Sequence, residues 1–155
     1  LRDIKKAAKR AEIIVVTKEE SIQIIKDLAA EYNISKLAAV TAGGKTRQES
    51  VINGVRKISE KTQMIAVHDG ARPLVAPENI EKTIADARVF NGAVLGVPVK
   101  DTIKVADDDG YVKDTPERSS LWMVQTPQAF FYPLVKDAYE KVLAKDAEIS
   151  AKYNA

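Results

Sequence analysis

The chain has 155 residues, of which 45% are hydrophobic and 30% charged, so it has room for one globular domain and is too apolar to be disordered. Its 24 basic and 22 acidic residues leave a formal charge of +2, and the basic residues are scattered, which indicates no broad DNA- or RNA-binding surface. The absence of cysteine excludes disulfides, a thiol nucleophile and cysteine-based metal sites. No apolar run approaches the roughly 20 residues of a membrane helix, and residues 1–10 lack the apolar centre of a signal peptide. We therefore expect a soluble, cytoplasmic protein without a membrane or nucleic-acid partner.

The chain begins with an alternation of predicted helices and strands. Apolar residues at helical spacing within 1–10 indicate that it opens inside, or at the end of, an amphipathic helix. The run 12–16 is Glu12 followed by four apolar, β-branched residues, as in a strand buried in a parallel sheet. Thr17 and Glu20 fit a capping box, which predicts a helix ending near Tyr32. The expected buried face of this helix is Ile22, Ile25, Leu28 and Ala29.

The same alternation continues through the middle of the chain. We expect strands at 37–40, 64–67 and 92–99, with the loop 41–47 leading into one helix and Pro77 opening another. The apolar face of the first of these helices is Val51, Ile52, Val55 and Ile58. Regular alternation of this kind predicts an α/β domain with a parallel sheet, right-handed crossovers and helices on its faces.

The pattern changes after the fourth strand. Residues 101–118 contain no amphipathic helix, and Asp109-Gly110 between β-prone segments predicts a protruding hairpin arm. Pro133 is expected to start the last clear helix, whose signal fades after Lys145. Its predicted inward residues are Leu134, Ala138, Val142 and Leu143.

Polar residues follow several of the predicted strands, where ligands bind in open α/β sheets. Gly43 and Gly44 would let backbone N–H groups approach a ligand, and Arg47 lies near the start of the next helix, where anions are favoured. The alternative is that Gly-Gly is an ordinary turn.

A second polar group follows residues 64–67. Asp69 is suited to Mg²⁺, and Arg72 could form a bidentate pair with phosphate. Alternatively, Asp69 caps a turn and forms an ion pair with Arg72. His68, the one histidine of the sequence, fits a hydrogen-bonded structural role better than a catalytic one.

Further hydroxyls and one more guanidinium fall in the predicted loops. These groups belong to Ser50, Thr102, Arg118 and Thr126. The sequence shows no Ser-His-Asp arrangement and no histidine cluster that could hold a metal. Phosphoryl or nucleotidyl transfer by positioning and charge is the chemistry that remains.

Four ordered strings resemble one family. They are Gly43-Gly44-Lys45-Thr46-Arg47-Gln48-Glu49-Ser50-Val51, His68-Asp69-Gly70-Ala71-Arg72-Pro73, Pro98-Val99-Lys100-Asp101-Thr102-Ile103-Lys104 and Gln125-Thr126-Pro127-Gln128. The chain is similar, from about Glu12 to Val142, to the 2-C-methyl-D-erythritol 4-phosphate cytidylyltransferases of non-mevalonate isoprenoid biosynthesis. This resemblance implies a Rossmann-like, glycosyltransferase-A-like nucleotidyltransferase fold with a β-hairpin dimerisation arm.

The resemblance also implies a reaction and a set of site residues. CTP and methylerythritol phosphate would give CDP-methylerythritol and pyrophosphate with Mg²⁺ and no covalent intermediate. The nucleotide would be bound by Gly43, Gly44, Lys45, Ser50 and Asp69. Of these residues, Gly44, Lys45 and Ser50 would line the cytosine and ribose pocket, and Asp69 would also hold the metal.

The second substrate is assigned in the same way. The methylerythritol phosphate would be bound by Arg72, Thr102, Arg118 and Thr126. Thr102 and Arg118 would reach it across a homodimer. The catalytic groups implied are Asp69, Arg72 and Arg118.

Two segments of the family have no match in these 155 residues. They are the first strand with its Gly-rich loop bearing Arg and Lys, and the later Thr-Asp-Asp and Asn-Ile-Lys motifs. We therefore expect a single nucleotidyltransferase domain over 1–155 that is incomplete at both ends, with the arm at 101–118 and little activity by itself. Two alternatives are a CDP-ribitol-type polyol phosphate cytidylyltransferase and a non-catalytic, dimer-forming α/β module.

Overall fold

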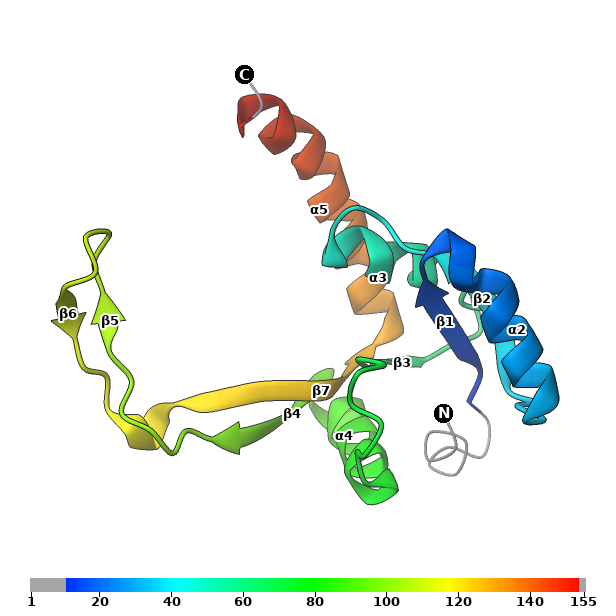
Figure 1. Ribbon diagram of the computed structural model, residues 1–155, viewed down its shortest axis with the longest axis horizontal. Coiled ribbons are helices and arrows are strands. Elements are labelled where there is room, and N and C mark those ends of the chain that lie inside the picture. The colour runs from blue at the N-terminus through cyan, green and yellow to red at the C-terminus, as the bar shows by residue number, and fades with distance from the viewer. Residues whose placement is uncertain (1–10, 154–155) are drawn as a thin grey trace.

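The computed structural model describes the backbone of residues 11–153 and the side chains of residues 11–142. Helices and strands alternate in most of this region (Figure 1). The elements are β1 (Ile13–Thr17), a 3-10 turn (Glu19–Ser21), α2 (Ile22–Glu31), β2 (Leu37–Ala42), α3 (Arg47–Val55), β3 (Met64–Val67), α4 (Pro77–Phe90), β4 (Gly92–Pro98), β5 (Val105–Ala106), β6 (Val112–Asp114), a second 3-10 turn (Arg118–Ser120), β7 (Trp122–Phe131) and α5 (Tyr132–Tyr153). The helix expected within residues 1–10 lies outside the described residues.

The α/β class is confirmed, and so is parallel pairing at the start of the chain. β1 pairs with β2 in parallel, with Val15 opposite Val40 and Val16 opposite Thr41. The connection between them is α2, which packs on β2. A parallel pair requires such a crossover, because the second strand must start at the same end as the first.

The sequence did not reveal β7, which lies antiparallel between β3 and β4. Proline removes a ladder hydrogen bond, so Pro127 argues against a central strand here. The structure accommodates it where the β4–β7 register shifts, between the pairs Val94–Gln128 and Gly96–Val124. Thr126, expected in a loop, is therefore a buried residue of a strand.

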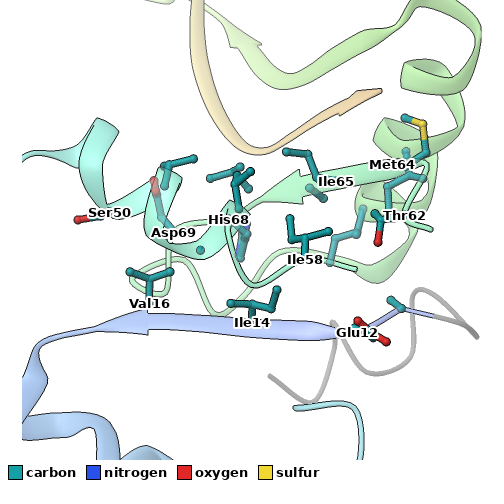
Figure 2. A pocket seen from close by; sticks show the side chains of 18 of the residues that line it. Glu12, Ile14, Val16, Ser50, Ile58, Thr62, Met64, Ile65, His68 and Asp69 are labelled. Carbon is teal, nitrogen blue, oxygen red and sulfur yellow. The ribbon is translucent and has the colours of Figure 1, made fainter. Parts of the chain in front are cut away.

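Apart from the pair β5–β6, the described strands form two separate sheets, β1–β2 and β3–β7–β4. β1 and β3 face each other across a cleft of about 1570 Å³ (Figure 2). Ile14 and Val16 line it from the β1 side, and Ile58 and Ile65 line it from the other. Both sheets thus present an apolar edge strand to the same space.

Many of the buried apolar residues belong to two clusters. Val55, Ile65, Tyr132 and Val135 join α3, β3 and α5, whereas Ile13, Ala29 and Ile34 join β1 to α2. The buried face expected for α2 included Leu28. This residue is exposed in the structure.

The inward face of α5 also differs from the prediction. Tyr132, Val135 and Tyr139 pack against the core, whereas Leu134, Ala138 and Val142 are exposed and Leu143 lies beyond the described side chains. Helical periodicity identifies an apolar stripe, but it does not say which of two neighbouring stripes meets the core.

The hairpin within residues 101–118 is present as β5 and β6, which pair antiparallel. Its turn closes by a hydrogen bond from the amide of Gly110 to the carbonyl of Asp107, and the φ of Gly110 is +87°, which glycine adopts without strain. Figure 1 shows the hairpin at the far end of the long β4–β7 ribbon, away from the helices. In the part of the chain that the structure describes, no helix has the length and apolar character needed to cross a membrane.

Candidate functional site

One end of the cleft collects the polar side chains that follow the strands. β1 and β3 run in the same direction in Figure 2, so that Val16 lies at the same end as Ser50, His68 and Asp69. Gly43, at the end of β2, also lines this end. The carboxyl ends of the strands therefore form the candidate site, as expected for an open α/β fold.

The loop after β2 is closed by side chains of α3. The amide of Gly44 donates to Oγ of Ser50 at 3.0 Å, and that hydroxyl donates to the carbonyl oxygen of Thr46 at 2.9 Å. The amide of Lys45 donates to the Glu49 carboxylate. Two of the amides expected to meet a ligand are thus held by this chain's own hydroxyl and carboxylate, which a ligand would have to replace.

The capping box of this region lies at Thr46 and Glu49. Oγ1 of Thr46 accepts the amide of Glu49 at 3.1 Å, while the Glu49 carboxylate turns back to the amide of Lys45. The capping box expected at Thr17 and Glu20 is wrong. Thr17 ends β1, and the 3-10 turn Glu19–Ser21 starts after Lys18 without a side-chain cap.

Both glycines of the loop are required by close contacts. A Cβ atom on Gly43 would lie 2.8 Å from Oγ of Ser50, and one on Gly44 would collide with the side chain of Glu49. The pair is therefore more than a flexible turn. It lets the end of β2 pass directly against the first turn of α3, which brings Ser50 to the cleft.

Asp69 lies between two guanidinium groups. Its Oδ2 is 3.3 Å from Nε of Arg72, and its Oδ1 is 3.7 Å from Nη2 of Arg47. The ion pair with Arg72, the structural alternative for these residues, is present. Arg47 joins it from the first residue of α3, and all three side chains remain 40% to 57% exposed. A half-exposed cluster of one carboxylate and two guanidinium groups is suited to bind phosphate.

His68 and Thr126 support the residue that bears the carboxylate. Oγ1 of Thr126 lies 2.9 Å from Nδ1 of His68 and accepts the amide of Asp69 at 3.2 Å. Nε2 of His68 lies 3.1 Å from the carbonyl oxygen of Arg72. Thr126 is only 4% exposed, so in this structure its hydroxyl supports the segment 68–69 from the protein interior.

Thr102 and Arg118 are not brought to the cleft. Thr102 lies in the segment between β4 and β5, and Arg118 starts the 3-10 turn before β7. Nη1 of Arg118 donates to the carbonyl oxygen of Lys100 at 2.9 Å, which ties the two sides of the arm together at its base. Neither residue lines the cleft of its own chain.

Three residues that were given no role in the predicted site belong to it by geometry, although the sequence already places Arg47 near a helix start that favours anions. Arg47 pairs with Asp69, Glu49 closes the glycine loop, and His68 spans the 69–72 turn. The Thr-x-x-Glu pattern at 46–49 was a signal for Glu49. No local pattern could have paired Arg47 with Asp69, because they lie 22 positions apart in the sequence.

Comparison with known proteins is consistent with this geometry. A family model described as 2-C-methyl-D-erythritol 4-phosphate cytidylyltransferase matches residues 2–154. Curated proteins of that name are 38% identical over 139 residues in Clostridium botulinum strain 657 and 44% identical over 133 residues in Caldanaerobacter subterraneus, covering 90% and 85% of this chain.

The fold has solved counterparts as well. A crystal structure from Anaerococcus prevotii, described as 4-diphosphocytidyl-2C-methyl-D-erythritol synthase, is 33% identical, has a TM-score of 0.84 and covers 92% of this chain. The chain spans 61%, 59% and 62% of the lengths of these three relatives. The match of the family model over nearly the whole chain shows that the chain belongs to the 2-C-methyl-D-erythritol 4-phosphate cytidylyltransferase family.

Proposed function

We propose that this chain supplies a large part of the active site of an enzyme that transfers CMP from CTP to 2-C-methyl-D-erythritol 4-phosphate. The observation that carries the proposal is the placement of Asp69 between Arg47 and Arg72, beside the Gly43-Gly44 loop. Such a site works by positioning and charge, which is what phosphoryl and nucleotidyl transfer demand of a protein.

The chemistry is an in-line displacement at phosphorus. A phosphate oxygen of methylerythritol phosphate forms a bond to the α-phosphorus of CTP, and the bond from that phosphorus to the bridging oxygen of the β-phosphate breaks, which releases pyrophosphate. Arg72 holds the attacking phosphate, and Arg47 offsets negative charge on the phosphates of CTP. Gly44, Lys45 and Ser50 hold the cytosine and ribose.

The donor set at the cleft fits Mg²⁺ held in part by substrate. Asp69 is half exposed, and the described residues contain no cluster of three acidic or histidine side chains that could enclose a metal. Mg²⁺ is commonly bound by one or two carboxylates together with substrate phosphates and water. Asp69 would hold the ion, which when bound neutralises charge on the triphosphate.

The second part of the proposal is a homodimer in which the arm of one subunit completes the site of the other. Arg118 and Thr102 lie away from their own cleft, so they serve catalysis from the arm only if they reach a partner. Exposed apolar residues on β7 and the hairpin suit burial against a second copy: Trp122, Met123, Val124, Tyr111 and Val112. Several exposed large apolar side chains near one another in the fold are consistent with an interaction site.

The test is pyrophosphate release by the protein expressed from its complete reading frame. CTP is supplied with methylerythritol phosphate or with ribitol 5-phosphate, in Mg²⁺ and in excess chelator. Turnover with methylerythritol phosphate alone, lost in chelator, supports the proposal. Turnover with ribitol phosphate alone identifies a CDP-polyol synthase. Absence of turnover with either substrate contradicts the proposal and favours the non-catalytic, dimer-forming module. A cytoplasmic location stays a prediction.

A further inference from the structure

His68 uses both ring nitrogens to connect a buried strand with an exposed turn. Nδ1 faces the hydroxyl of Thr126 on β7, and Nε2 faces the main-chain carbonyl of Arg72, four residues further along the chain. Both distances, 2.9 and 3.1 Å, are within the range of good hydrogen bonds. The imidazole therefore bridges the base of the turn to its last residue.

The direction of each hydrogen bond follows from the groups involved. A carbonyl oxygen only accepts, so Nε2 of His68 carries the hydrogen that meets Arg72. In the neutral ring Nδ1 is then an acceptor, and the Thr126 hydroxyl donates to it. The oxygen of that hydroxyl accepts the amide of Asp69 at 3.2 Å.

This gives one continuous chain of hydrogen bonds from the amide of Asp69, through Thr126 and His68, to the carbonyl of Arg72. Within the turn, the amide of Arg72 also donates to the carbonyl of Asp69 at 3.0 Å. The remaining link is the Asp69–Arg72 ion pair, which is half exposed and contributes only about 0 to 1 kcal/mol. His68 therefore adds a separate hydrogen bond at the Arg72 end of the turn, beside the two contacts that Arg72 makes with Asp69.

We infer that His68 is a positioning residue, which fixes the 69–72 turn so that the guanidinium of Arg72 is presented at a set distance from the carboxylate of Asp69. It acts through main-chain and hydroxyl groups and does not touch substrate. The inference rests on the proposed function, because His68 would orient Arg72, the side chain that would hold the phosphate of the second substrate.

Two substitutions separate the two halves of the bridge. In His68→Asn the amide oxygen lies near the place of Nδ1 and still accepts from Thr126, but the side chain is too short to reach the carbonyl of Arg72. In His68→Gln the amide nitrogen extends to the place of Nε2 and still donates to Arg72. The two variants thus form a matched pair of similar size and polarity.

The expected result is a selective loss in His68→Asn. The KM for methylerythritol phosphate rises about tenfold, the loss expected for one hydrogen bond, while the KM for CTP and the melting temperature stay close to those of the wild type. His68→Gln restores a KM near that of the wild type. If both variants lose activity toward both substrates in proportion to their melting temperatures, His68 is merely structural and the inference is wrong. Unchanged kinetics in both variants would also overturn it.

Amide hydrogen exchange provides a readout that does not need turnover. The amide of Arg72 should exchange about tenfold faster in His68→Asn than in the wild type or His68→Gln, while the amide of Asp69 stays protected by Thr126. A wild type without activity but with this exchange pattern would refute the proposed reaction and keep the positioning role. An Arg72 amide that exchanges equally in all three proteins would refute the positioning role whatever the reaction.

Discussion

Arg47 and Asp69 form an ion pair that spans the cleft, with Nη2 of Arg47 3.7 Å from Oδ1 of Asp69. Arg47 begins α3, which packs on β1 and β2, whereas Asp69 follows β3 of the other sheet. Both side chains are about half exposed, and a pair of this kind contributes only about 0 to 1 kcal/mol to stability. A phosphate group can therefore replace the Asp69 carboxylate as the partner of Arg47 at little cost.

We predict that Asp69→Asn nearly abolishes CMP transfer and leaves the fold intact. The amide keeps the shape of the carboxylate but loses the charge that a hard cation requires. The free energy of unfolding should change by less than about 1 kcal/mol, because the ion pairs of Asp69 are half exposed. Turnover against Mg²⁺ concentration and chemical denaturation measure the two effects. A wild-type rate with wild-type Mg²⁺ dependence would contradict the assignment.

We predict that Arg118 acts in the active site of the partner subunit. Asp69→Ala and Arg118→Ala, each inactive alone, are refolded together in equal amounts in the complete protein. Every heterodimer then gains one site with both residues intact, so random assembly restores about a quarter of native sites. Heterodimers confirmed by mass without recovered activity would show that Arg118 serves its own subunit or only the base of the arm.

We predict that Gly44→Ala destabilises the protein by about 1 to 2 kcal/mol, since the new Cβ collides with Glu49 and breaks the capping interactions of α3. The matched control is Gly96→Ala, whose Cβ would meet its nearest atom, the carbonyl oxygen of Met123, at an ordinary 3.5 Å. Denaturant unfolding of both variants checks the difference. Equal stabilities would mean that the glycine loop relaxes without cost.

We predict that Val135→Ala costs about 2 kcal/mol of unfolding free energy, because it removes buried methyl groups from the cluster with Val55 and Ile65. The neighbouring Leu134→Ala should change stability by less than about 0.5 kcal/mol, since Leu134 is 54% exposed. Thermal or denaturant unfolding compares the two. A larger loss for Leu134 would mean that α5 packs through the face expected from periodicity.

We predict that alternate amides of β1 differ in hydrogen exchange in the 155-residue chain. The amide of Ile13 donates to the carbonyl oxygen of Lys36, which lies just before β2. Because successive amides of a strand point to opposite sides, the amides of Ile14 and Val16 point away from β2 and toward the cleft. They should exchange faster than the amide of Val15. Uniform protection along the strand, measured by NMR, would show that another segment pairs with the edge of β1 that faces the cleft.

The sequence was sufficient for most elements of the fold and for the motif residues. Strand 64–67 was predicted with the bounds of β3, and Pro77 opens α4 as expected, because β-branched runs and helix-start signals are local. The hairpin turn at Asp109-Gly110 was predicted for the same reason. Gly43, Gly44, Ser50 and Asp69 were identified from their strings and do share one end of the cleft.

Only the tertiary structure decided how these pieces meet. The place of β7 between β3 and β4 depends on pairing between residues far apart in the sequence, and Pro127 hid the strand from local patterns. The choice of Val135 over Leu134 as the inward residue depends on which face of α5 meets Val55 of α3 and Ile65 of β3. The pairing of Arg47 with Asp69, and the bridge from Thr126 through His68, join chemical groups whose partners are set by spatial proximity and not by sequence spacing. Residue types and periodicity therefore determined the elements and the chemistry available, whereas long-range packing determined which charges and hydroxyls act together.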